Sequence, residues 1–321
     1  MSTLYLHSGP FKTGSTFLQN AIPSFIVVPK SDSVRLGFGP RLGWPEGTFN
    51  VSWLAGVLEP ENPFLFELTK HSWPTQDPFQ VLNQELEQGD VFLSGEHMGN
   101  LSPTGYERLK DYIGPHEVKV MLFARPYESR FLSQWQESIK WGETISFRDA
   151  VEAQFSNARQ RDNFDLSRKY KSAVEGIGDE SCVSISTLAC NRFSLEELCM
   201  MLSKWTSQTI NIDYDPGVAG NRGLNFKFTS LVVTLNHVIE SGCRTEAIAN
   251  TFAKQLESNL EKVEEYLASH VTEALETLKK LKNLELRSLS EMRPNCPEGT
   301  DSLLEEISQN RSPAVRRFFK T

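Results

Sequence analysis

The segment VKVMLFA at residues 118–124 constrains the fold more than any other, because it is apolar almost throughout. Strands of this kind are typical of parallel sheets that helices cover on both faces. Other short strands and helical patterns alternate with it along the chain, at residues 3–7 (strand), 91–95 (strand), 104–113 (helix), 126–140 (helix), 162–175 (helix), 183–186 (strand) and 194–205 (helix). This alternation predicts an α/β fold, a parallel sheet flanked by helices with right-handed crossovers.

The chain of 321 residues is interpreted as a single domain, 1–321, with two unusual stretches. Residues 29–80 are rich in Pro, Gly and Trp and predict an irregular region with short helices, where a binding pocket can be built. Residues 244–290 have apolar side chains at three- and four-residue steps, and from Thr245 to Leu289 there is no Gly or Pro. This predicts a long helical C-terminal part. It either packs on the sheet or forms a dimerising coiled coil or a lid, so a homodimer is one expectation.

Charge and cysteine content limit the classes of partner. Lys and Arg total 33 and Asp and Glu total 41, giving a net charge of −8, so nucleic acid is not an expected partner. The five cysteines form no CxxC pair, which indicates reduced thiols in a cytoplasmic protein rather than a disulfide frame or a zinc site. No apolar run approaches the ~20 residues that a membrane span needs, and the N-terminus does not read as a signal peptide.

The loop HSGPFKTGST at residues 7–16 lies between a predicted strand and a predicted helix. Unpaired backbone N–H groups and the helix dipole make such a position suitable for a phosphate or sulfate. Gly14 allows close approach of the backbone, Thr13, Ser15 and Thr16 belong to the same loop, and Lys12 adds a cation. The lysine precedes Gly14 by two residues, which differs from the Gly-Lys-Ser/Thr order of nucleotide triphosphatases.

A second pattern follows the strand at residues 118–124. Arg125 stands at its end, and its planar guanidinium can bind a phosphate through several donors. Ser133 follows eight residues later, in the predicted helix, and offers a hydroxyl group. The two residues therefore suit a second anionic group.

These two segments, in this order and in these elements, resemble the signatures of sulfotransferases that use 3′-phosphoadenosine 5′-phosphosulfate (PAPS), most of all bacterial members. The resemblance extends from residue 3 to about residue 240 and implies a P-loop-like sulfotransferase fold. It implies that residues 12–16 bind the 5′-phosphosulfate, that Phe17 stacks on adenine, and that Arg125 and Ser133 hold the 3′-phosphate. The Arg-Lys-Gly loop of cytosolic animal members is not present in this sequence.

The resemblance also implies a catalytic base. Glu96 and His97 follow the predicted strand at residues 91–95, at the carboxyl edge of the sheet, where ligands of open α/β folds bind. Glu96 is the favoured base and His97 the second choice. Lys12 is expected to stabilise the charge that develops on the bridging oxygen, and no metal ion is expected.

The expected function is transfer of a sulfuryl group from PAPS to a hydroxyl or amine of an acceptor that the sequence does not identify, either a small molecule or a carbohydrate. Residues 29–80 are the expected acceptor side. Two alternatives remain open at this point. One is a P-loop kinase that uses ATP and Mg²⁺, and the other is a protein that binds PAPS or its desulfated product without turnover.

Overall fold

The computed structural model describes only part of the chain, at residues 1–9, 18–19, 21–22, 25–28, 36–37, 50–69, 77–140, 143–157, 165–186 and 195–212. Residues 12–17 of the predicted phosphosulfate loop lie outside the described residues. The predicted helical part at residues 244–290 also lies outside them.

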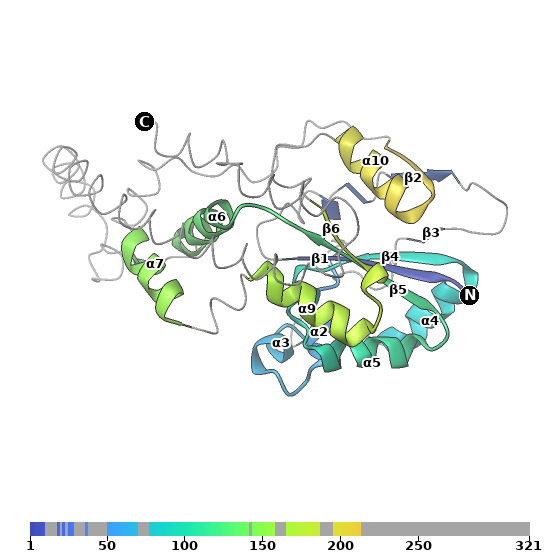
Figure 1. Ribbon diagram of the computed structural model, residues 1–321, viewed down its shortest axis with the longest axis horizontal. Helices are drawn as coiled ribbons and strands as arrows, with labels where there is room; N and C mark the ends of the chain where they lie inside the picture. Colours follow the sequence, from blue (N-terminus) through green and yellow to red (C-terminus); the bar gives the residue numbers. More distant parts are fainter. Residues whose placement is uncertain are drawn as a thin grey trace, which may run out of the picture. The chain divides into compact units, whose positions relative to one another are not determined.

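A parallel sheet with helices around it forms the centre of the described structure (Figure 1). Its strands follow the order β3-β4-β1-β5-β6, and all neighbouring strands run parallel. The bounds are β1 Thr3–Ser8, β3 Leu36–Gly37, β4 Asp90–Ser94, β5 Glu117–Phe123 and β6 Val183–Ser186. The predicted α/β class is therefore confirmed, and the four predicted strands are all found in the sheet.

Strand β1 lies in the middle of the sheet because its side chains are apolar or neutral on both faces. Leu4 and Leu6 are fully buried on one face, and Tyr5 is buried on the other, as the alternation of a strand requires. In the register, Leu6 is paired with Leu93 of β4 on one side and with Val120 of β5 on the other. These apolar neighbours fix the register, since a slip by one residue would exchange the two faces.

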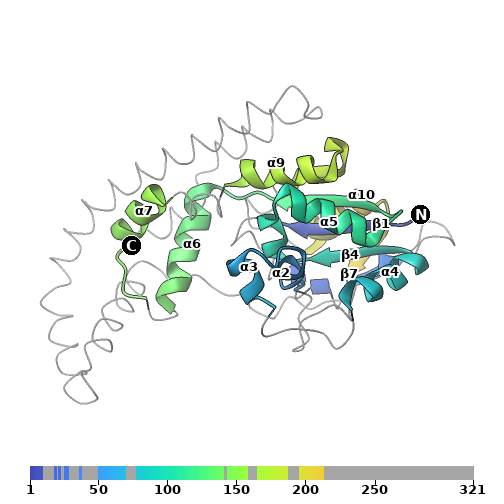
Figure 2. The same ribbon diagram turned by 90° about the horizontal axis from the view of Figure 1, so that it is seen from below.

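The helices α4 (Pro78–Gln88), α5 (Pro103–Ile113) and α9 (Leu166–Ile177) cover one face of the sheet, and α10 (Leu195–Thr206) covers the other (Figures 1 and 2). The first three helices have N-cap side chains that accept hydrogen bonds from the first turn, namely Asp77, Ser102 and Asp165. Such caps satisfy N–H groups that have no partner within the helix and set where each helix begins.

The α10 face of the sheet is closed by an apolar cluster that joins β1, β4, β5 and α10. Its buried members are Tyr5, Leu18, Ala21, Ile22, Phe92, Met121, Phe123, Leu198, Cys199, Leu202 and Ile210. A second sheet consists of two antiparallel strands, in which β2 (Phe25–Val28) pairs with β7 (Thr209–Ile212). The sequence did not predict this sheet.

Shorter elements lie around the carboxyl edge of the sheet. They are α2 (Leu54–Leu58), α3 (Pro63–Glu67) and the 3₁₀ helix η3 (Glu96–Asn100), whereas a second 3₁₀ helix, η4 (Glu180–Cys182), directly precedes β6 at the amino edge. Helix η3 directly follows β4 and contacts β1, α2 and α9. The residues that the sequence assigns to the base are thus in a short turn, not in a long helix.

The chain divides into two compact units. The first comprises residues 1–125, 165–220 and 288–309, and it contains the parallel sheet. The described part of the second unit contains α6 (Tyr127–Lys140) and α7 (Phe147–Ser156), which lie between β5 and α9 in the sequence. In this unit the ring of Trp135 lies 5.1 Å from that of Phe147, and its Nε1 donates to Ile145 O at 3.0 Å.

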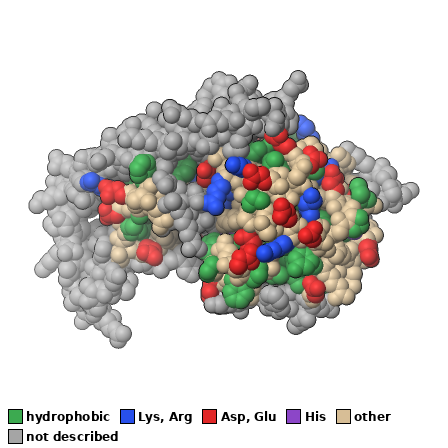
Figure 3. Space-filling view, turned by 60° about the horizontal axis from the view of Figure 1, so that its bottom comes forward, with side chains coloured by type: hydrophobic (Ala, Val, Ile, Leu, Met, Phe, Trp, Pro, Cys, Tyr) green, Lys and Arg blue, Asp and Glu red, His purple; other side chains and the backbone are tan. Residues whose placement is uncertain are grey.

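Figure 3 shows one face of the molecule, on which acidic and basic side chains of the described residues are interspersed and apolar side chains lie among them. The basic side chains of the described residues on this face lie apart from one another rather than in a stripe. None of the helices among the described residues is long and apolar enough to cross a membrane.

Candidate functional site

Three strand ends meet at the carboxyl edge of the sheet, and each is followed by residues singled out in the sequence. Strand β1 lies between β4 and β5, so Gly9, which follows β1, lies between the ends of these two strands. His7 is paired with Ser94 of β4, and Gly95 N donates to His7 O at 3.0 Å. The carboxyl edge therefore brings the start of the loop next to the residues that follow β4.

Glu96 and His97 are the first two residues of η3, and both are partly buried. The backbone N–H of His97 donates to Ser52 Oγ at 3.2 Å. Tyr106 Oη on α5 donates to Met98 O at 3.0 Å. The turn that presents the two candidate bases is thus bonded to residues from separate parts of the first unit.

A close backbone approach joins η3 to the start of the loop. A Cβ atom on Gly99 would lie 3.1 Å from Gly9 N and 3.2 Å from Ser8 Oγ, which is tighter than ordinary contact. Glycine at position 99 therefore allows the turn to lie directly against the end of β1.

His97 has surroundings that keep its imidazole neutral. Its ring lies 5.4 Å from the ring of Phe64 on α3, at an angle of 52°. Burial, and secondly the charge of Lys169, lower the pKa of His97 to about 4. At neutral pH the ring is therefore uncharged and able to accept a proton.

Lys169 is the residue of this region that sequence reasoning missed. It lies on α9 with only 3% of its surface exposed, and its Nζ donates to Gly99 O at 3.4 Å and to Asn100 Oδ1. One signal was present in the sequence: Lys169 is on the same side of the helix as Leu166, Ala173 and Ile177, where an apolar residue is expected.

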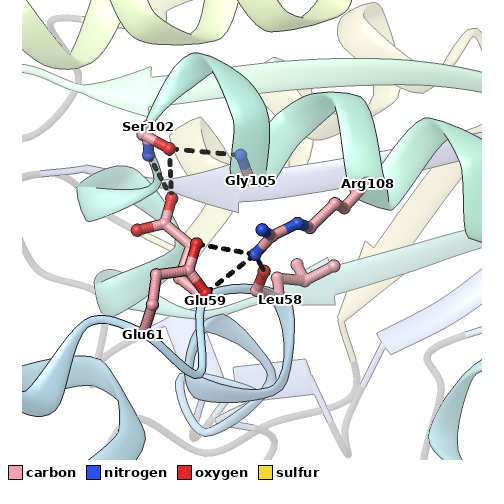
Figure 4. Close-up of polar contacts among 6 residues, drawn as sticks. All are labelled: Leu58, Glu59, Glu61, Ser102, Gly105 and Arg108. Carbon is pink, nitrogen blue, oxygen red and sulfur yellow. Dashed lines mark hydrogen bonds and ion pairs between the residues drawn. The ribbon is translucent and has the colours of Figure 1, made fainter.

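A hydrogen-bonded cluster fixes the segment of α2 and α3 to the start of α5 (Figure 4). Glu59, which is 5% exposed, accepts hydrogen bonds from Ser102 N at 2.5 Å and from Ser102 Oγ at 2.7 Å. Arg108 donates to Leu58 O at 2.7 Å and pairs with Glu61 at 2.8 Å. This cluster anchors the segment that carries Ser52 and Phe64, the two neighbours of His97.

His7 is the second-last residue of β1 and is fully buried. Its Nδ1 shares a hydrogen bond with Ser94 Oγ at 2.9 Å, and Gln19 Nε2 donates to the same hydroxyl at 3.3 Å. Burial lowers the pKa of His7 to about 3, so it is neutral as well. Gln19 follows the loop in sequence, so this trio joins the strand before the loop to the segment after it.

Arg125 and Ser133 belong to different units. Arg125 follows β5 by two residues and is partly buried, and Ala124 N donates to Ser186 O of β6 at 2.7 Å, which fixes the backbone beside it. Ser133 is partly buried on α6 in the second unit. Among the described residues, no group of three or more His, Cys, Asp or Glu side chains is placed to hold a metal ion.

No model of a known protein family matches the chain, and no curated protein matches it.

Proposed function

We propose that the chain is a PAPS-dependent sulfotransferase with a P-loop-like fold. The observation that carries this proposal is the strand order. With β1 between β4 and β5, the strand that precedes the KTGST loop in the sequence ends between the residues that follow its two neighbours: Glu96 and His97 on one side, and Arg125 on the other. An open parallel sheet binds its ligands at this edge.

The proposed reaction is an in-line displacement at sulfur. The acceptor oxygen or nitrogen forms a bond to sulfur, the bond from sulfur to the bridging phosphate oxygen breaks, and 3′-phosphoadenosine 5′-phosphate leaves. The proton of the acceptor passes to the base. Lys12 and the backbone N–H groups of the loop stabilise the charge on the bridging oxygen, and such preorganised donors each contribute about 3–4 kcal/mol.

Two side chains are candidates for the base. Glu96 was favoured from the sequence, and its place at the start of η3 is compatible with that role. His97 is the second candidate: its imidazole is neutral at pH 7 and lies against Phe64, and its lowered pKa makes it a weaker base than free histidine. Comparison of Glu96→Gln with His97→Asn separates them: the variant that loses kcat while nucleotide binding survives identifies the base.

The nucleotide site has a sharper test. Arg125→Ala should weaken binding of 3′-phosphoadenosine 5′-phosphate by about 10- to 150-fold, because a charge-assisted hydrogen bond contributes about 1.5–3 kcal/mol. Binding of adenosine 5′-monophosphate, which has no 3′-phosphate, should hardly change. Calorimetric titration of both nucleotides measures this. Equal losses for the two would show that Arg125 supports the fold or the 5′ end.

Activity itself is tested with labelled PAPS and a panel of phenol, carbohydrate and amine acceptors. Lys12→Ala should lower turnover by about 10²-fold or more, because the transition-state charge loses a partner. Turnover with ATP and Mg²⁺ instead of PAPS would support the hypothesis that the chain is a kinase. Tight binding of the desulfated nucleotide without turnover on any acceptor would establish a binding protein.

The proposal also includes a cytoplasmic location and a possible homodimer. Cys182 and Cys199 are both buried as free thiols, which is compatible with a reducing compartment. Dimerisation through residues 244–290 is checked by light scattering of the full chain at high micromolar concentration, where a monomer would contradict it.

A further inference from the structure

Lys169 is a buried cation that the proposed reaction does not use. Its side chain is among the most buried polar groups of the first unit, although it lies on α9 among apolar residues. Removing an ammonium group from water is costly unless polar groups replace the water. Its Nζ donates to Gly99 O and to Asn100 Oδ1, which both belong to η3.

These two acceptors end the same turn that Glu96 and His97 begin. A 3₁₀ helix of five residues has few hydrogen bonds of its own, so its position depends on bonds from outside. Ser52 Oγ holds its beginning at His97 N, and Lys169 holds its end. A cation also suits the carbonyl groups at the end of a helical turn.

We propose that Lys169 is a positioning residue for the candidate base: its ammonium fixes the end of η3 through Gly99 and Asn100 and places a positive charge beside His97. Only the catalytic consequence of this inference rests on the sulfotransferase proposal. The position of the turn and the protonation of His97 do not require a nucleotide.

Among the described residues, the titratable groups that face η3 from β1, α5 and the end of α2 are neutral or already bonded. From β1, His7 is buried and uncharged, because burial lowers its pKa to about 3. From α5, Tyr106 is neutral because burial raises its pKa. Next to α2, the Glu59 carboxylate is bonded to Ser102.

Lys169 therefore acts on His97 together with burial, and both lower the pKa of His97, to about 4. Glu96 is the acidic neighbour on η3 itself. An imidazole in this setting is neutral when the acceptor arrives. The imidazolium that forms after proton transfer lies beside a second cation, so it loses its proton readily to solvent.

The test is a titration of the full-length protein, without nucleotide, with its histidines labelled at ¹³Cε1 and followed by NMR. His97→Gln assigns the His97 signal among the six histidines of the chain. In the wild type this signal should titrate well below the usual pKa of about 6.5. In Lys169→Met its pKa should rise by up to about one pH unit, since burial is the larger cause of the shift, and in Lys169→Arg it should stay low.

Lys110→Met is the matched control. Lys110 is on α5, and its Nζ donates to Ile177 O at the far end of α9 at 2.6 Å. Like Lys169, it is a lysine that donates to a backbone carbonyl. Its loss should leave the His97 titration unchanged. An equal rise in Lys110→Met and Lys169→Met would show a general loosening of α9 and would overturn the proposal.

Activity gives a second readout. With PAPS, the acid limb of the kcat/KM profile should move to higher pH in Lys169→Met and return in Lys169→Arg. An unchanged His97 titration in folded Lys169→Met overturns the proposal. If that variant does not fold, the wild type decides, since a His97 pKa at or above 6.5 also overturns it. Absence of turnover with PAPS would count against the sulfotransferase proposal alone.

Discussion

The two faces of the parallel sheet are closed in different ways. Below α10 the contacts are apolar and aromatic: the ring of Trp205 lies 5.2 Å from that of Tyr5 and 6.1 Å from that of Phe92. Under α5 and α9 the sheet is apolar as well, with Leu4 and Leu6 fully buried, but hydrogen-bonding groups are added at the starts of these helices, namely Glu59, Ser102, Tyr106 and Lys169. We call the first the apolar face and the second the polar face.

The difference separates stability from positioning. Apolar contacts are non-directional, so they stabilise the sheet without fixing the orientation of any one turn. Buried hydrogen bonds require particular distances and angles, so the polar face determines where η3 lies. Substitutions on the apolar face should therefore lower the free energy of unfolding and leave the pKa of His97 unchanged. Substitutions on the polar face should shift the pKa of His97.

The largest effect is expected on the apolar face. Leu202 is 1% exposed in the cluster under α10. Leu202→Ala should lower the free energy of unfolding by about 2–5 kcal/mol, because it removes buried methyl groups and leaves a cavity. Urea denaturation measures this. The His97 signal of the folded variant should titrate as in the wild type, and a shifted pKa would remove the distinction between the faces.

Acid should destabilise the protein through His7, whose ring lies 4.1 Å from Phe123 of the apolar cluster. Its pKa is about 3 in the folded state and about 6.5 when unfolded. The unfolded chain therefore binds the proton more readily, and stability falls as the pH falls from about 6.5 toward 3. By linkage the loss between pH 7 and pH 4 is up to about 3 kcal/mol.

The control for this prediction is His7→Gln, which cannot take up the proton. Its unfolding free energy, measured by urea denaturation at several pH values, should fall less steeply below pH 6.5 than that of the wild type. The slopes are compared rather than the absolute stabilities, because the substitution also alters the bond to Ser94. Parallel slopes would show that His7 does not govern the acid response.

A smaller effect is expected where α5 and α9 cross. A Cβ atom on Gly176 would lie 2.3 Å from Pro103 O and 2.5 Å from Tyr106 Cβ. Gly176→Ala should therefore separate the two helices, at a cost of about 1–3 kcal/mol in unfolding free energy. Because α9 also carries Lys169, the pKa of His97 should rise.

Gly114→Ala is the matched control, since Gly114 ends α5 with a φ of 64° and no heavy atom within 4 Å of the added Cβ. This variant should lose stability, by about 1 kcal/mol, through its backbone conformation alone. Its His97 titration should not move. A shift there as large as in Gly176→Ala would show that the crossing does not control the turn.

The smallest effect concerns the acceptor and rests on the proposed function. Phe64 is 36% exposed and contacts His97, so it can offer its ring to an aromatic acceptor. Phe64→Ala should raise KM for 2-naphthol by about 2- to 10-fold, as expected for one aromatic pair. Phe66→Ala, on the same helix and 43% exposed, is the control and should leave KM unchanged. Equal KM values in both variants would exclude an acceptor contact at Phe64.

Much of the sheet was predictable because its strands are nearly continuous apolar runs. Residues 183–186 form β6 as predicted, and α5 and α10 lie within one residue of their predicted bounds. The pairing of β2 with β7 was not predictable, because the two strands are 180 residues apart and no local pattern joins them. Helix α7 was missed as well, although Ser146 caps its first turn by accepting from Asp149 N.

The candidate site was predictable only as a set of strand ends. The positions of Glu96 and His97 followed from the strand before them, and the structure places both in η3. Lys169 was not predicted, since a lysine in a helix with many charges is normally in solvent. Only the packing of α9 against η3 shows that its charge is buried.

The close approach of Gly99 to Gly9 has a thermodynamic consequence. The turn that carries His97 lies so close to Gly9 that no Cβ atom fits at position 99 without displacement of the neighbouring atoms. If a nucleotide held by the loop changes the proton affinity of His97 by some factor, protonation of His97 must change nucleotide affinity by the same factor. Proton uptake and nucleotide binding at this edge would then form one linked equilibrium. Nucleotide titrations at a series of pH values measure the factor by which protonation changes the affinity.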